Sequence, residues 1–128
     1  MKLEEKTILI IEDEQDLADT YKLKLKNAGY NVIIAADGLK ALAAVKENKQ
    51  IDLILLDLIL PQRSGFSLLK DFKENPESEK IPIFILSNLS LEKEIDQGLK
   101  LKADKYLIKT DYTPEKIVNL VNEYFAGK

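Results

Sequence analysis

Five short aliphatic runs recur along the chain, and the segments between them return apolar residues at helical spacing. The central run, Leu53 to Leu56, shows no period-two alternation, which is typical of a strand buried on both faces of a parallel sheet. We predict strands over residues 7–11, 31–36, 52–57, 82–87 and 105–108.

Helical spacing predicts five helices, each following one of these strands. They are expected over residues 14–28, 38–47, 65–74, 90–101 and 113–125. In the second helix we expect the turns to be spaced by Leu39, Leu42, Ala43 and Lys46. The fourth helix, with Ser90 as its predicted N-cap, has only Leu91, Ile95 and Leu99 as a stripe and contains Gly98, so it is expected to be the least firmly held.

Strict alternation of strands and helices predicts an α/β fold, a doubly wound five-stranded parallel sheet flanked by five helices, as a single domain over residues 1–128. Right-handed crossovers place the carboxyl ends of all strands at one edge, where such folds bind ligands. That edge is predicted to collect five chemically active residues: Glu12, Asp13, Asp57, Ser87 and Lys109.

Composition narrows the possible functions. The chain is 45% hydrophobic and 32% charged with a net charge of −3, so no overall basic surface invites nucleic acid or an anionic membrane. Cysteine and histidine are absent, which excludes disulfides and a phosphohistidine of its own. The first residues lack the apolar core of a signal peptide and no segment approaches transmembrane length, so a cytoplasmic location is expected.

The polar residues at the predicted edge suit phosphoryl chemistry. Crowded carboxylates repel one another, and Mg²⁺, which prefers oxygen ligands, relieves that repulsion. Asp57 could then act as a nucleophile toward phosphorus, with Lys109 and Ser87 offering an ammonium and a hydroxyl to the phosphoryl oxygens. Taken singly, such residues are more often helix caps, turn formers or edge-strand lysines; their convergence favours a reactive site.

The sequence resembles the receiver domain of bacterial two-component response regulators, including the single-domain chemotaxis type, over essentially its whole length. The motifs that carry the resemblance are ILIIEDE at 8–14, LILLDLILPQRSG at 53–65, IFILSN at 83–88 and ADKYLIK at 103–109. It implies a flavodoxin-like, receiver-type fold and a set of residue roles: an Mg²⁺ site of Glu12, Asp13, Asp57 and the Ile59 backbone carbonyl, Asp57 as phosphoacceptor, Lys109 as phosphate-binding lysine, Ser87 as the conserved hydroxyl and Tyr106 as the switch aromatic.

The resemblance also implies partners. A histidine kinase or a histidine phosphotransfer protein would supply the phosphoryl group, and a downstream protein would bind the face formed by the fourth helix, fifth strand and fifth helix. Three departures stand out: Thr110 replaces the proline that usually follows the lysine, Asn88 replaces a small residue, and Ile59 and Leu89 are apolar where polar residues are common. Because a non-proline cis bond is costly, we expect the Lys109–Thr110 bond to be trans, with Tyr112 as the packing aromatic.

Two other functions remain open. A receiver-like module could bind partners without being phosphorylated. A phosphatase with an aspartyl nucleophile would need a second acid two residues after Asp57, where this chain has Ile59. A nucleotide-binding module is weaker still, because the sequence has no glycine-rich phosphate loop.

Overall fold

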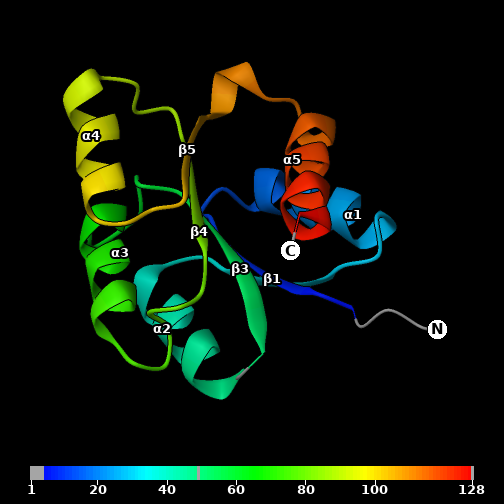
Figure 1. The fold of residues 1–128 in the computed structure, drawn as a ribbon, viewed down its shortest axis with the longest axis horizontal. Helices are drawn as coiled ribbons and strands as arrows, with labels where there is room; N and C mark the ends of the chain where they lie inside the picture. The colour runs from blue at the N-terminus through cyan, green and yellow to red at the C-terminus, as the bar shows by residue number, and fades with distance from the viewer. Residues whose placement is uncertain (1–4, 49, 128) are drawn as a thin grey trace.

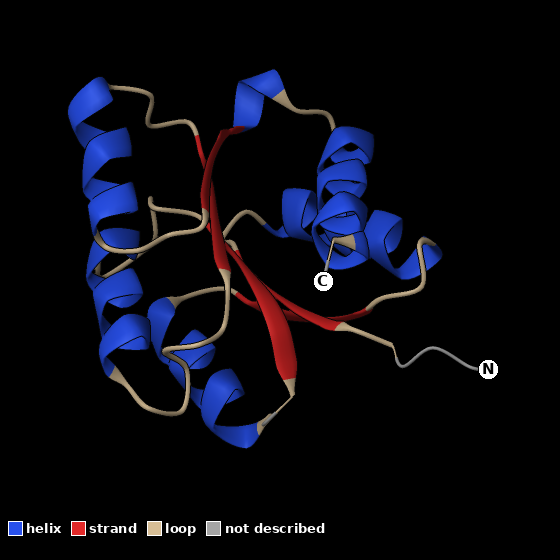
Figure 2. Ribbon diagram, in the orientation of Figure 1, coloured by secondary structure: helices blue, strands red, loops and turns tan. Residues whose placement is uncertain are grey.

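The computed structural model describes residues 5–48 and 50–127, which form one five-stranded parallel sheet in the order β2-β1-β3-β4-β5. Helices cover both faces of this sheet (Figure 1), and Figure 2 shows the strands as a single twisted layer between them. The elements in chain order are β1 (Thr7–Ile11), α1 (Gln15–Asn27), β2 (Asn31–Ala35), α2 (Gly38–Glu47), β3 (Ile51–Leu56), α3 (Gly65–Glu74), β4 (Ile83–Ser87), α4 (Glu92–Lys100), β5 (Lys105–Ile108), a 3₁₀ turn (Lys109–Asp111) and α5 (Pro114–Ala126).

The sheet divides the interior into two cores, because neighbouring residues of each strand point to opposite faces. In β1, Ile8 and Ile10 pack against α1 and α5, whereas Leu9 and Ile11 pack toward α2 and α3. Figure 1 shows α1 and α5 together on one side of the sheet and α2, α3 and α4 on the other. The predicted doubly wound fold is therefore confirmed.

Local signals fix several helix starts as predicted. The Asp37 and Thr113 side chains cap α2 and α5, accepting hydrogen bonds from the backbone N–H groups of Lys40 and Lys116. Pro114 occupies the first turn of α5, where its missing N–H costs no helical hydrogen bond.

The structure shows which residues of α2 are buried, and it corrects the predicted start of α4. The Leu39 side chain is 75% exposed, because α2 buries the smaller side chains of Ala41, Ala44 and Val45 instead. The helix α4 starts two residues after Ser90, with Leu91 at the N-cap position.

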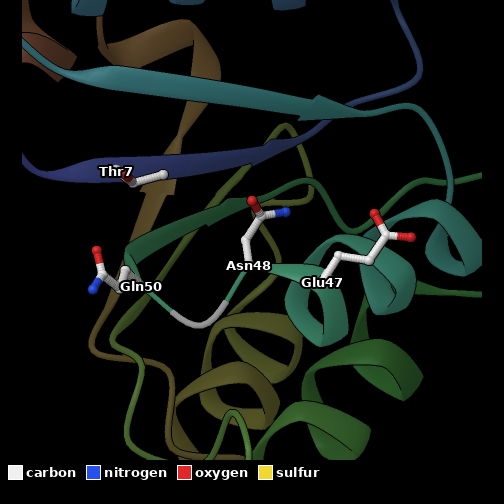
Figure 3. A pocket seen from close by; sticks show the side chains of 4 residues that line it. All are labelled: Thr7, Glu47, Asn48 and Gln50. Atoms are coloured by element: carbon white, nitrogen blue, oxygen red, sulfur yellow. The ribbon is translucent and has the colours of Figure 1, made fainter.

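A shallow hollow of about 370 Å³ lies at the amino ends of the strands, opposite the predicted site. It is lined by Thr7, Glu47, Asn48 and Gln50 (Figure 3). None of the predicted site residues lines it, since they follow the other ends of the strands. Within the described part of the chain, no helix is both long and apolar enough to cross a membrane.

Candidate functional site

The carboxyl ends of four strands place the predicted site residues. Glu12 follows the last residue of β1, Asp57 follows β3, Ser87 ends β4 and Lys109 follows β5. The Asp57 backbone N–H donates to the Ile11 carbonyl (3.0 Å), which extends the ladder between β3 and β1 by one step. The backbone of the central carboxylate is thus fixed by the sheet.

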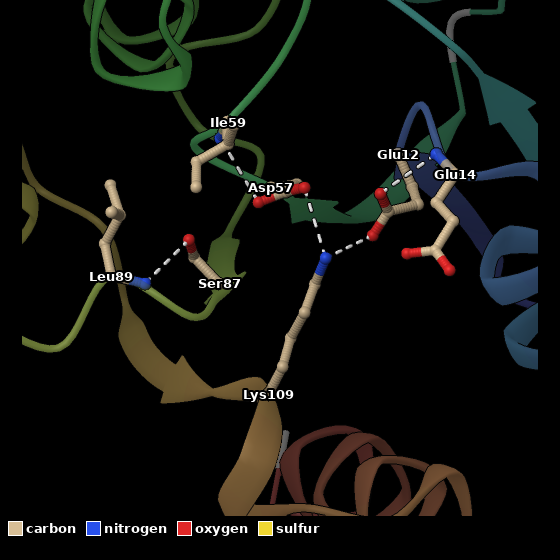
Figure 4. A network of polar contacts seen from close by, with 7 residues as sticks. All are labelled: Glu12, Glu14, Asp57, Ile59, Ser87, Leu89 and Lys109. Carbon is tan, nitrogen blue, oxygen red and sulfur yellow. Dashed lines mark hydrogen bonds and ion pairs between the residues drawn. The ribbon is translucent and has the colours of Figure 1, made fainter.

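The Lys109 ammonium lies between two buried carboxylates (Figure 4). Its Nζ donates to Glu12 Oε1 at 2.6 Å and to Asp57 Oδ2 at 3.1 Å. Glu12 and Asp57 are only 4% and 6% exposed. A buried carboxylate is costly without a partner, and this lysine is the cation that offsets the cost for both.

Three carboxylates gather around this position. One oxygen from each of Glu12, Asp13 and Asp57 lies within 4.8 Å of the others, and Asp13 is the exposed member of the group. All three offer hard oxygen ligands, which suits a divalent cation such as Mg²⁺.

Burial and charge alter the acid–base properties of this group. Burial raises the pKa of the Glu12 carboxyl above its ordinary value, and the nearby negative charge of Asp57 adds to the increase. Burial alone would lower the pKa of Lys109, but its hydrogen bond to Glu12 and the charge of Asp57 outweigh that effect, so the pKa is raised. Lys109 therefore stays protonated at neutral pH.

The loop after β3 holds the second oxygen of Asp57. The Ile59 backbone N–H donates to Asp57 Oδ1 at 3.2 Å, while the Ile59 side chain is 56% exposed. Gly65 closes this loop by donating its N–H to the Leu58 carbonyl (2.8 Å). A Cβ at Gly65 would lie 2.5 Å from the Asp57 carbonyl oxygen, so only glycine fits there.

Ser87 and Tyr106 are connected through the backbone of Leu89. The Leu89 N–H donates to Ser87 Oγ (3.3 Å), and the Tyr106 hydroxyl donates to the Leu89 carbonyl (2.6 Å). Ser87 is fully buried, and burial raises the pKa of Tyr106 to about 12. The Tyr106 hydroxyl is thus joined to the Ser87 side chain through the Leu89 backbone.

The peptide bond after Lys109 has the predicted trans conformation. No cis peptide bond occurs within residues 5–48 and 50–127, so the Lys109–Thr110 bond is trans as predicted. The chain turns from β5 into α5 through the 3₁₀ turn, and Tyr112 packs against the core shared by α1 and α5.

Sequence reasoning missed three contributors to the site. The backbone of Leu89 and the glycine at position 65 act through main-chain geometry, which side-chain chemistry does not reveal. A glycine opening a helix after a turn-rich loop was the available signal for Gly65. Tyr21 of α1 is also near the charges, since it lines one small hollow together with Glu12 and Asp57. Helical spacing placed Tyr21 on one face of the first helix but gave no sign that it would lie beside the site.

Comparisons with known proteins agree with this arrangement. A family profile described as "Response regulator receiver domain" matches residues 8–122. The DNA-binding dual master transcriptional regulator RpaA of Synechocystis is 37% identical over 102 residues, covering 80% of this chain and 42% of RpaA. The chain spans less than half the length of RpaA and of other curated relatives that it matches.

Solved structures are similar over nearly the whole chain. A CheY-like receiver domain protein from Methanospirillum hungatei superposes with a TM-score of 0.87 at 27% identity, covering 97% of this chain and 96% of its own. The phosphorylated cyanobacterial phytochrome response regulator RcpA gives a TM-score of 0.81 at 26% identity, covering 94% of this chain and 91% of its own.

Proposed function

The chain belongs to the response regulator receiver domain family, and from this premise we propose that Asp57 accepts a phosphoryl group from a histidine kinase or a histidine phosphotransfer protein. Receiver domains are signalling modules of two-component systems rather than classical enzymes. The observation that carries the proposal is the buried Asp57 carboxylate, which pairs with Lys109 and lies close to two further acids at the carboxyl edge of the sheet. The phosphorylated state of the RcpA neighbour supports it.

In the proposed reaction, an Asp57 oxygen attacks the phosphorus of the donor phosphohistidine. The P–N bond breaks, its electron pair returns to the imidazole, and Asp57 carries an acyl phosphate. Lys109 already contacts Asp57 and is charged, so its ammonium can bind a phosphoryl oxygen with little rearrangement. Ser87 supplies a hydroxyl from the neighbouring strand.

The residues present fit a divalent cation. Glu12, Asp13 and Asp57, together with the Ile59 backbone carbonyl, would hold Mg²⁺, and their close carboxylate oxygens are the observation that supports this. When bound, the ion supplies positive charge that reduces repulsion between these carboxylates and the phosphoryl oxygens.

The output surface in this proposal is the face formed by α4, β5 and α5. The Leu91 and Leu99 side chains beside and on α4 are 57% and 47% exposed, which suits contact with a downstream protein. Phosphorylation would reach this face through Ser87, the Leu89 backbone and Tyr106, the switch aromatic of the proposal. The expected setting is the cytoplasm, without a nucleic-acid or membrane partner for this domain.

Incubation with acetyl phosphate and Mg²⁺, followed by intact mass measurement, tests the central step. We expect one phosphoryl adduct on the wild-type chain and none on Asp57→Asn. The matched control is Asp52→Asn in β3, the strand that Asp57 follows. The Asp52 carboxylate accepts a hydrogen bond from the Thr7 N–H at 2.8 Å, and its replacement should not affect the adduct. A wild-type chain without an adduct would favour a module that binds partners unphosphorylated.

The phosphatase alternative has a separate test. It requires a second acid close after Asp57, and the exposed Ile59 side chain occupies that position. Steady release of phosphate from a small ester such as p-nitrophenyl phosphate, lost in Asp57→Asn, would support it. We expect no such turnover.

A further inference from the structure

Helix α4 contacts the sheet through a glycine. Gly98 is the buried residue of α4, whereas Leu99 is 47% exposed and Ile95 is half-buried. Glycine is the least favourable residue in a helix interior after proline. A glycine at the one buried position therefore calls for a packing reason.

The space beside Gly98 is filled by two side chains of the sheet. A Cβ at position 98 would lie 2.6 Å from Ile85 Cδ1 and 3.0 and 3.3 Å from Tyr106 Cδ2 and Cε2. Ile85 is fully buried, and the Tyr106 ring is rigid and moves only as a unit. A side chain at position 98 would have to displace Ile85 Cδ1 and shift the ring by a few tenths of an ångström, or else lift the helix.

The other end of the Tyr106 ring is also held. Its hydroxyl donates to the Leu89 carbonyl at 2.6 Å, and the Leu89 N–H donates to Ser87 Oγ. The ring is thus enclosed between Gly98 of α4 and the loop that leads from β4 to α4. A movement of the ring away from Gly98 would therefore have to be accommodated at its hydrogen bond to Leu89 as well.

We propose that Gly98 is a positioning residue for Tyr106: the missing side chain at position 98 makes the space in which the ring lies while α4 remains packed on the sheet. The position of α4 is therefore tied to that of the ring. This inference deepens the proposed function, because it explains how a change near Ser87 reaches the surface of α4, but the contact itself exists in the unphosphorylated chain.

The test isolates the ring from the nearer isoleucine. Ile85→Val removes Cδ1, so of the three atoms nearest to a Cβ at position 98 only the two of the Tyr106 ring remain. We expect Gly98→Ala to lower the folding equilibrium constant by about tenfold or more when Tyr106 is present. With Tyr106→Ala added, the same change should be neutral or raise the constant by up to about fivefold, because alanine favours the helix.

A spectroscopic measurement separates positioning from general stability. With ¹³C-labelled tyrosine, the Tyr106 ring signals are assigned using Tyr106→Phe, and their exposure is measured with a soluble paramagnetic agent. Gly98→Ala in the Ile85→Val background should expose the ring or speed amide hydrogen exchange in α4. Gln97→Ala, an exposed change on the same helix, should do neither.

Each outcome decides the inference. Unchanged ring signals and α4 exchange in the Gly98→Ala variant would overturn it. If Gly98→Ala in the Ile85→Val background fails to fold, adding Tyr106→Ala must restore folding. A triple variant that still fails to fold would show that the clash is not with Tyr106, which would also overturn the proposal. The acetyl phosphate adduct at Asp57 is scored separately, so loss of the wild-type adduct counts against the proposed function and leaves the Gly98 contact standing.

Discussion

Replacing Lys109 with methionine removes the one cation found between Glu12 and Asp57 in the described residues. The two ion pairs, 2.6 and 3.1 Å long, join a lysine whose side chain is 13% exposed to two buried carboxylates. Removing one partner of a buried pair costs about 3–5 kcal/mol. Because Lys109 keeps some contact with water, we expect a loss near the lower limit, about 3 kcal/mol.

The loss should be measured as thermal unfolding by circular dichroism at pH 7 in a chelator. For a domain of this size about 3 kcal/mol corresponds to a fall of roughly 10–15 °C in Tm. The pKa of Lys109 is raised in the folded state, so its stabilising contribution is complete below the unfolded value of 10.5 and disappears only as pH rises through the folded value. The full effect is therefore present at pH 7.

Mg²⁺ should reduce the difference in Tm between the wild type and Lys109→Met, because it brings positive charge to the same carboxylates. At one hundred times its Kd a ligand adds about 2.7 kcal/mol to the folded state. Lys24→Met is the matched control, since Lys24 pairs with Glu115 at the surface and its loss should leave Tm nearly unchanged. If Lys109→Met has the same Tm as the wild type in chelator, the two carboxylates do not depend on this lysine for stability, and the prediction is refuted.

Three further results are expected. Burial lowers the pKa of Lys73, so the folded chain binds that proton less tightly than the unfolded chain does. The stability of the wild type relative to Lys73→Met should therefore increase as pH rises toward 10.5, which denaturation of both proteins over a pH series would measure. Gly65→Ala should cost about 3 kcal/mol or more in urea unfolding, because its Cβ meets the Asp57 carbonyl oxygen; an unchanged midpoint would contradict this close approach. Ile59→Asn combined with Leu89→Glu should hasten loss of the phosphoryl adduct, followed by mass over time, by offering hydrogen bonds to the attacking water; equal rates would show that these apolar side chains do not set the lifetime.

The strands could be predicted because their aliphatic runs are both long enough and interrupted by polar residues at the correct ends. Topology then brought Glu12, Asp57, Ser87 and Lys109 to one edge without any knowledge of distance. The expected backbone after Lys109 followed from the cost of a non-proline cis bond. The strands and the trans bond could be predicted because each depends only on local sequence, a single strand in one case and a single peptide bond in the other.

The helices show where such patterns stop. Helical spacing named Leu39 among the residues that recur along the second helix but did not show which face is buried; α2 packs closely through alanines and leaves that leucine exposed. At α4 the buried contact is Gly98, a residue that carries no hydrophobic signal. Close packing of small residues depends on which surface lies opposite, and that surface comes from distant parts of the chain.

The hydrogen bond between Lys109 and Glu12 joins residues 97 positions apart. A chain emerging from the ribosome exposes Glu12 and Asp57 long before β5 exists, and during that interval the two acids lack their cation. The charge cluster is completed only when the first and last strands share one sheet. Under the proposed function, an Asp57 that is paired with Lys109 requires that synthesis has reached β5 and that the sheet has assembled, so a product that ends before β5 would carry Asp57 without its cation.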